Sequence, residues 1–268
     1  MNKLLKDAER MTSRLIHDDC LTAMGLITDN AFDLTVTSPP YDNLRTYSES
    51  LQWNEDIWKQ VIKELFRVTK EGGVVVWVVG DSTVKGSETG TSFKQALWAM
   101  ECGFNLHDTM IYKKTGGGAR GSNLSYWQNF EYMFVFSKGR PKTVNLIKDK
   151  VNATAGNKNS GVNGRGKNGE QRFKKVTTTA ALGRRENVWV IPAGNNTADD
   201  KTSHPAVFPE SLAMDHIVSW SNEGDTVFDP FMGSGTTGKM ATMVNRNFVG
   251  VEKVAEYFEI AKQRINYE

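Results

Sequence analysis

The chain has 268 residues, of which 39% are hydrophobic and 24% are charged, a balance typical of a globular protein with one large α/β domain or two small ones. No apolar run approaches the roughly 20 residues of a membrane span, and the charged N-terminal stretch lacks the apolar core of a secretory signal. Cys20 and Cys102 form no Cys-x-x-Cys pair, and the histidines form no His-Glu-x-x-His motif, which argues against a disulfide scaffold, a zinc ribbon and a catalytic metal. We therefore expect a cytoplasmic protein without a metal centre.

Strand and helix patterns alternate along the first half of the chain. A β-favouring run over residues 32–37 stops at Ser38-Pro39-Pro40, because adjacent prolines cannot continue a central strand. The run therefore ends in a loop at the carboxyl end of a strand. Hydrophobic spacing and flanking glycines predict the other elements, which are, in chain order, a helix at 56–70, a strand at 73–80 buried on both faces, a helix at 92–102 and strands at 109–112 and 132–136.

The composition changes after Lys138. Residues 140–186 contain 12 Lys or Arg and 3 Asp or Glu, a local net charge of +9 in a chain whose total is +2. A surface for a polyanion and a basic loop without a partner both fit this composition. Within the segment, Asn157–Gly169 has no hydrophobic periodicity, and we expect it to be mobile without a ligand.

Regular patterns return near the C-terminus. They predict a strand at 188–192, a helix at 209–221, a strand at 226–228, a helix at 239–244, a strand at 247–251 and a helix at 255–265. Alternating elements of this kind favour an α/β fold with a mostly parallel sheet flanked by helices.

A glycine-rich turn at residues 233–238 lies between a predicted strand and a predicted helix. Its glycines allow a close approach of backbone to ligand, and the helix N-terminus offers unpaired N–H groups. As a bare pattern the turn fits G-x-G-x-x-G, with Glu252 following 19 residues after Gly233, so an NAD-dependent Rossmann oxidoreductase is an open alternative. Asp229-Pro230-Phe231 and the late position in the chain favour another ligand, and the absence of a following Lys excludes a nucleotide-triphosphate loop.

Two motifs together carry a family resemblance. The run Asp229 to Thr237 resembles the S-adenosylmethionine-binding motif of DNA amino-methyltransferases, and Thr37 to Tyr41 resembles their catalytic loop. The catalytic motif precedes the cofactor motif with the basic segment between them, an order similar to that of the β class. The resemblance implies a Rossmann-like methyltransferase fold with an inserted target-recognition region. Its parts would be a catalytic part at 1–139, a DNA-binding and partly flexible recognition region at 140–186 and a cofactor-binding part at 187–268.

The resemblance also implies how the cofactor is held. The glycine turn would enclose its methionine part, Glu252 would accept hydrogen bonds from the ribose hydroxyls, and Asp19 would approach the adenine. His204 stands where the family often has Lys, so a surface histidine remains an equal alternative for it. The residues implied to bind the cofactor are Asp19, Thr37, His204, Pro205, Asp229, Pro230, Phe231, Gly233, Ser234, Gly235, Thr236, Thr237 and Glu252.

The catalytic loop suits chemistry at an exocyclic amino group, whose lone pair is delocalised into the base. Ser38 Oγ and the Pro39 carbonyl would accept the two amino hydrogens, Pro39 and Pro40 would hold that carbonyl rigidly, and Tyr41 would stack on a base flipped out of the duplex. Methylation at cytosine carbon 5 needs a cysteine nucleophile, usually after a proline, and neither cysteine follows one. The resemblance favours cytosine N4, since Ser in the first loop position usually accompanies it; adenine N6 stays open because both amino groups need the same acceptors.

The expected partner is double-stranded DNA and not a membrane. A homodimer and a separate restriction endonuclease remain open, as does a non-catalytic DNA-binding module. Basic side chains of the recognition region would pair with phosphates. The candidate DNA-binding residues are Arg45, Arg140, Lys142, Arg165, Lys167, Arg172, Lys174, Lys175, Arg184 and Arg185.

Overall fold

The computed structural model describes residues 13–40, 53–115, 126–159, 162–165, 167–173, 176–192 and 208–265. The chain divides into two compact units, of which the first comprises residues 1–145 and 187–268 and the second residues 146–186. The first unit contains the central sheet and the helices, and the second is an antiparallel ribbon.

An eight-stranded sheet in the order β1-β16-β15-β2-β3-β7-β6-β14 forms the centre of the first unit. Neighbouring strands are parallel, except that β7 runs antiparallel to β3 and β6. This confirms the predicted α/β fold with a mostly parallel sheet. The strands are β1 (Ser13–His17), β2 (Phe32–Thr37), β3 (Thr69–Val79), β6 (Asn105–Thr115), β7 (Phe130–Ser137), β14 (Val188–Pro192), β15 (Thr226–Asp229) and β16 (Asn247–Glu252), and a small hairpin of β4 (Thr83–Val84) and β5 (Ser87–Glu88) follows β3.

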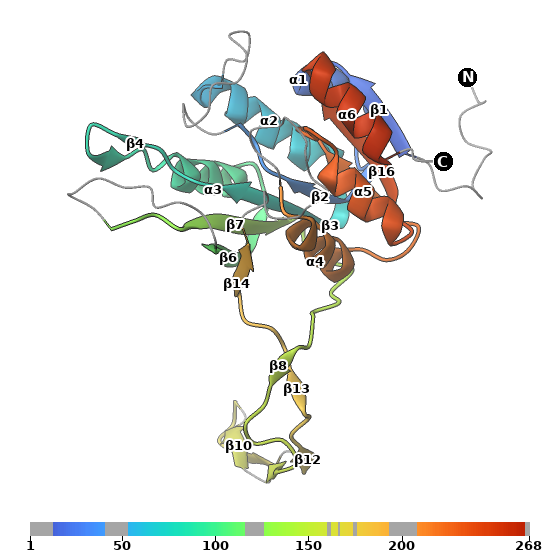
Figure 1. Ribbon diagram of the computed structural model, residues 1–268. Coiled ribbons are helices and arrows are strands. Elements are labelled where there is room, and N and C mark those ends of the chain that lie inside the picture. Colours follow the sequence, from blue (N-terminus) through green and yellow to red (C-terminus); the bar gives the residue numbers. More distant parts are fainter. Residues whose placement is uncertain are drawn as a thin grey trace. The chain divides into compact units, whose positions relative to one another are not determined.

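Helices cover both faces of this sheet (Figure 1). One face carries α1 (Cys20–Gly25), α2 (Glu55–Val68) and α3 (Thr91–Glu101), and the other carries α4 (Glu210–Trp220), α5 (Thr236–Met243) and α6 (Ala255–Ile265). The predicted double-sided burial of β3 is confirmed, because Val74, Val76 and Val78 belong to the core under α4–α6 while Val75 and Trp77 belong to the core under α1–α3.

Helix α2 ends earlier than its sequence predicts, at Val68 rather than at residue 70. The buried ammonium of Lys138 donates to the carbonyl oxygens of Phe66 and Thr69, each at 3.0 Å, and to Asn30 Oδ1 at 2.9 Å. A cation at a helix C-terminus satisfies carbonyls that lack helical partners. The following residues can therefore join β3 at once, with Thr69 paired to Phe32.

Elements β1 and α1 were not predicted, because β1 is a short, half-buried edge strand without a clear apolar alternation. Helix α5 begins at Thr236 rather than at Lys239. The last residues of the glycine-rich motif are therefore the first turn of a helix.

The second unit is one long hairpin built from three nested antiparallel pairs. These are β8 (Lys150–Val151) with β13 (Leu182–Gly183), β9 (Lys158–Asn159) with β12 (Thr177–Thr178), and β10 (Val162–Arg165) with β11 (Gln171–Phe173). Two of these strands, β9 and β10, lie in the stretch that shows no hydrophobic periodicity, and they are defined by their pairing with β12 and β11. Ion pairs between Lys150 and Glu186 and between Asp149 and Arg185 join the two sides of its base.

The two residues that flank the second unit along the chain belong to the first unit and are hydrogen-bonded within it. The N–H of Asn145 donates to the Ser219 carbonyl at 2.8 Å, and the Asn187 carbonyl accepts the N–H of Ile111 at 2.8 Å. The chain therefore leaves and rejoins the larger unit at defined positions.

Candidate active site

Three of the predicted site segments meet at one edge of the sheet. Ser38 follows β2, Asp229 ends β15 and Glu252 ends β16, and these three strands are parallel neighbours in the sheet. Carboxyl ends of parallel strands form the usual ligand-binding edge of such a fold. The topology therefore brings the two sequence motifs together.

A buried hydrogen bond joins the ends of β2 and β15. Thr37 Oγ1 donates to Asp229 Oδ1 at 2.7 Å, and the N–H of Phe231 donates to the same oxygen at 3.0 Å. Only 4% of Asp229 is exposed. Burial raises the pKa of its carboxyl to about 6, against hydrogen bonds from Thr37, Phe231 and Thr237 that act to lower it. Pro39 is buried and Ser38 is half-buried beside this pair.

Glu252 holds the glycine turn. Its Oε2 accepts the N–H of Gly233 at 2.9 Å, and its Oε1 accepts the N–H of Val254 at 2.7 Å. Burial raises the pKa of Glu252, while these backbone hydrogen bonds act to lower it. Gly233 and Gly235 have φ angles of 50° and 83°, a conformation that favours glycine.

Two glycines of the motif contact protein rather than open space. A Cβ on Gly235 would lie 2.9 Å from Ala261 Cβ, and a Cβ on Gly238 would lie 2.4 Å from Ile265 Cδ1 and 2.5 Å from Phe248 Cε1. The sequence pattern predicted a close approach of these glycines to a ligand. The structure shows that both also allow α6 and β16 to pack against the turn and α5.

Substituting Gly238 by Ala should therefore destabilise the protein by about 1–3 kcal/mol, because a methyl group there overpacks a closed contact. Urea unfolding monitored by circular dichroism measures this change. Gly25→Ala in α1 is the matched control, since nothing lies within 4 Å of an added Cβ at that position. Equal stability of the two variants would contradict the packing role of Gly238.

Asp19 lies at the same edge of the sheet. Its Oδ1 accepts the N–H of Leu21 at 3.0 Å and caps α1, and its Oδ2 is 3.4 Å from Lys253 Nζ. Because β1 pairs with β16, His17 lies opposite Glu252. The structure thus brings the predicted adenine-side and ribose-side carboxylates to neighbouring strand ends.

The ring of Phe231 contacts two tryptophans. Its ring lies edge-on to Trp53 at a centroid distance of 5.4 Å and to Trp77 at 6.4 Å. Trp77 is buried in β3, where its Nε1 donates to Gln95 Oε1 at 2.9 Å. The sequence does not single out Trp53, because no spacing pattern identifies a residue just before a helix as a neighbour of a distant turn.

Several predicted site residues lie outside the described residues. These are Tyr41, Arg45, Lys174, Lys175, His204 and Pro205. Of the other basic candidates, Arg165 and Arg172 belong to strands β10 and β11, Lys167 and Arg184 are exposed, and Arg185 is paired with Asp149 at 2.6 Å.

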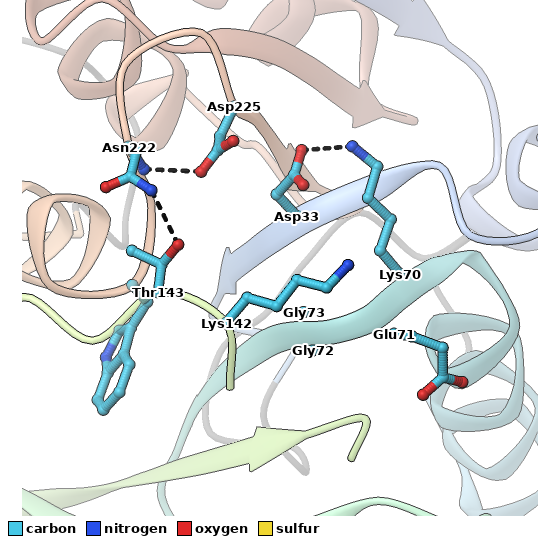
Figure 2. Close-up of a pocket in the computed structure, with 10 residues that line it drawn as sticks. Asp33, Lys70, Glu71, Gly72, Gly73, Lys142, Thr143, Asn222 and Asp225 are labelled. Carbon is cyan, nitrogen blue, oxygen red and sulfur yellow. Dashed lines mark hydrogen bonds and ion pairs between the residues drawn. The ribbon is translucent and has the colours of Figure 1, made fainter. Parts of the chain in front are cut away.

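Lys142 lies at the opposite edge of the sheet from Asp229. Figure 2 shows a pocket at the amino ends of β2, β3 and β15, and Lys142 lines it together with Asp33, Lys70 and Asp225. The Asp33 carboxylate accepts a hydrogen bond from Lys70 Nζ at 2.6 Å and another from the N–H of Thr226 at 3.0 Å. Asp33 therefore joins the starts of β3 and β15. The structure does not bring Lys142 to the site at the carboxyl ends.

A mostly parallel sheet with a buried acid and a glycine turn at adjacent carboxyl ends is the arrangement expected of a Rossmann-like methyltransferase. A family model described as DNA methylase, which covers N6- and N4-specific enzymes, matches residues 32–263, and the chain belongs to this family. It is a DNA amino-methyltransferase that uses S-adenosylmethionine, as the two sequence motifs predicted. The comparisons do not support an NAD-dependent oxidoreductase.

Relatives and solved structures extend this likeness over nearly the whole chain. The orphan methyltransferase M.BamHII of Bacillus amyloliquefaciens is 55% identical over 90% of this chain and 91% of its own length. The DNA adenine methyltransferase YhdJ of Escherichia coli is 27% identical over 94% of this chain and 82% of its own. The cytosine-N4-specific PvuII DNA methyltransferase has a TM-score of 0.71 at 20% identity, covering 96% of this chain and 89% of that one. This last likeness concerns the fold.

The described residues fit the cofactor. The Glu252 carboxylate accepts backbone N–H groups, and because a carboxylate has about four acceptor positions it keeps capacity for a ribose hydroxyl. Among the helices of the described segments, none combines the length and the apolar composition that a membrane span requires. Within the same segments, no group of three or more His, Cys, Asp or Glu side chains could hold a metal ion.

Proposed function

We propose that this protein methylates the exocyclic amino group of a base flipped out of double-stranded DNA, with cytosine N4 as the favoured target and adenine N6 as the alternative. The Thr37–Asp229 hydrogen bond carries the proposal. It joins Thr37, the last residue of β2, to Asp229, the first residue of the cofactor motif. The residue after Thr37, Ser38, is thereby kept beside the cofactor site.

The chain's own groups would activate the amino nitrogen. Ser38 Oγ and the Pro39 carbonyl accept its two hydrogens and draw the nitrogen toward tetrahedral geometry, which frees its lone pair. Pro39 is buried, so its carbonyl is held in place. Tyr41 stacks on the flipped base. S-adenosylmethionine, when bound, supplies an electrophilic methyl group on a sulfonium. Transfer of that methyl to the nitrogen would break the sulfur–methyl bond, leave S-adenosylhomocysteine and release one amino proton to solvent, so no covalent enzyme intermediate is needed.

Mass spectrometry of nucleosides tests the target base. Genomic DNA from a host without methyltransferases would be incubated with the protein and S-adenosylmethionine. N4-methylcytosine is the expected product, because in the family that the catalytic loop resembles, Ser in the position of Ser38 usually accompanies cytosine N4 methylation. N6-methyladenine would overturn the choice of base while keeping the enzyme class. Cofactor binding without any modified base would favour a non-catalytic DNA-binding module.

We further infer that residues 140–186 recognise the target sequence, between a catalytic part at 1–139 and a cofactor-binding part at 187–268. The antiparallel ribbon at 146–186 supports this inference, because a two-stranded ribbon fits the major groove of B-DNA. Lys167 lies in its turn, and both Lys167 and Arg184 are exposed. Their cations suit phosphate contacts.

Replacing Lys167 and Arg184 together by Ala should weaken DNA binding and reduce its dependence on salt. Each lost phosphate contact should lower the slope of log K against log salt by about 1. Fluorescence anisotropy over a salt series measures the slope. Lys262→Ala removes an exposed cation from α6 and is the control. An unchanged slope in the double variant would exclude these phosphate contacts.

A further inference from the structure

Helix α6 reaches the glycine turn through one side chain that no motif marks. Arg264 Nη1 donates to the Ser234 carbonyl at 3.0 Å, to Ser234 Oγ at 2.8 Å and to Thr236 Oγ1 at 3.2 Å. Only 15% of the Arg264 side chain is exposed, and Ser234 and Thr236 are buried. One cation therefore binds both the tip of the turn and the first residue of α5.

Glu210 orients this guanidinium from a second helix. It is the first residue of α4, and its Oε1 accepts Arg264 Nη2 at 3.2 Å and Lys239 Nζ at 2.6 Å. Arg264, Lys239 and Glu210 come from α6, α5 and α4. The planar guanidinium of an arginine donates hydrogen bonds in two fixed directions, and it therefore sets the relative positions of its partners more rigidly than the flexible ammonium of a lysine would.

The turn also has little freedom to move away from α6. Gly235 lies so close to Ala261 that a Cβ would be 3.0 Å from its Cα. The positive φ of Gly235 keeps the backbone in a conformation that other residues rarely adopt. Backbone packing thus seats the turn on α6, and Arg264 fixes its hydroxyl and carbonyl groups.

We propose that Arg264 is a positioning residue for the cofactor, holding the turn at Gly233–Thr236 in the shape that encloses the methionine part of S-adenosylmethionine, with Glu210 setting the orientation of its guanidinium. The inference rests on the proposed role of the turn as the cofactor site. Arg264 acts through Ser234 and Thr236 and takes no part in activating the base. Its loss should therefore affect cofactor affinity, and not the rate of methyl transfer once cofactor and DNA are saturating.

Arg264→Met tests this, because it removes the donors and keeps most of the aliphatic stem. Calorimetry with S-adenosylmethionine should show a Kd raised roughly 10- to 100-fold, the size expected for lost charge-assisted hydrogen bonds. Arg264→Lys should recover part of the affinity, since it keeps the charge but not the fork. The kcat at saturating cofactor and the Kd for DNA should stay within about twofold of wild type in both variants.

Lys262→Met is the matched control, because it removes a more exposed cation of the same helix that pairs with Glu259. If Arg264→Met does not fold, Glu210→Gln is the second variant, and it should raise the cofactor Kd by a smaller factor. Wild-type cofactor affinity in the folded Arg264→Met variant, or in Glu210→Gln if that variant replaces it, would overturn the inference. A fall in kcat at unchanged cofactor Kd would overturn it too. Absence of cofactor binding by the wild-type protein would instead overturn the proposed function of the turn.

Discussion

Thr37→Val is expected to lower the rate of methyl transfer at saturating cofactor and DNA by roughly 10- to 100-fold. Valine keeps the shape of threonine but removes the hydroxyl that donates to Asp229 Oδ1. A hydrogen bond to a charged buried group contributes about 1.5–3 kcal/mol. Without this hydrogen bond, the end of β2 and the following Ser38 are no longer fixed beside the cofactor motif. Small displacements of reacting groups lower the reaction rate strongly. Single-turnover kinetics measure the effect.

Thr37→Ser is the control for this experiment, because serine keeps the donor and loses only a methyl group. Its rate should stay within about threefold of wild type. Equal rates for the Val and Ser variants would show that the hydroxyl does not position the catalytic loop.

Asp229→Asn is expected to become progressively more stable, relative to wild type, as the pH rises. Burial raises the pKa of Asp229 to about 6 in the folded protein, against about 3.9 in an unfolded chain. The folded state therefore binds the proton more tightly. The stability that this group contributes is complete below about pH 4 and is lost as the pH rises through about 6. The Asn side chain does not titrate and retains an oxygen that can accept from Thr37 and Phe231.

The difference in unfolding free energy between the Asn variant and wild type should grow by up to about 3 kcal/mol between pH 4 and pH 7.5, since two pKa units correspond to roughly that amount. Urea unfolding at a series of pH values measures it. A difference that stays constant with pH would contradict a carboxyl that is desolvated in the folded state.

Most of the central sheet could be predicted from the sequence because its strands carry strong local patterns. The run of valines in β3 can only be buried on both faces, and the structure places it at the middle of the sheet. The prolines after β2 and the glycines after β15 mark where those strands end. Because parallel strands align their carboxyl ends, these prolines and glycines imply that Ser38 and Asp229 lie at the same edge of the sheet.

What the sequence did not reveal depends on neighbours that are distant along the chain. The end of α2 is set by Lys138, whose ammonium reaches the helix from the end of β7. Arg264 looks like an ordinary basic residue in the last turn of an amphipathic helix, and only the tertiary fold places it on Ser234. Gly235 and Gly238 were predicted to face a ligand. A glycine is required both where the backbone closely contacts protein and where it closely contacts a ligand, so the sequence does not distinguish the two cases.

The anchoring of the two residues that flank residues 146–186 has a consequence for how such enzymes can change. Asn145 and Asn187 are anchored by hydrogen bonds to Ser219 and Ile111 within the larger unit, and the ribbon between them pairs with itself. A ribbon of another sequence or length could therefore be grafted between these two asparagines without rebuilding the methyl-transfer machinery. With the proposed recognition role of this ribbon, exchange of this one segment would change the DNA sequence preference in a single evolutionary step.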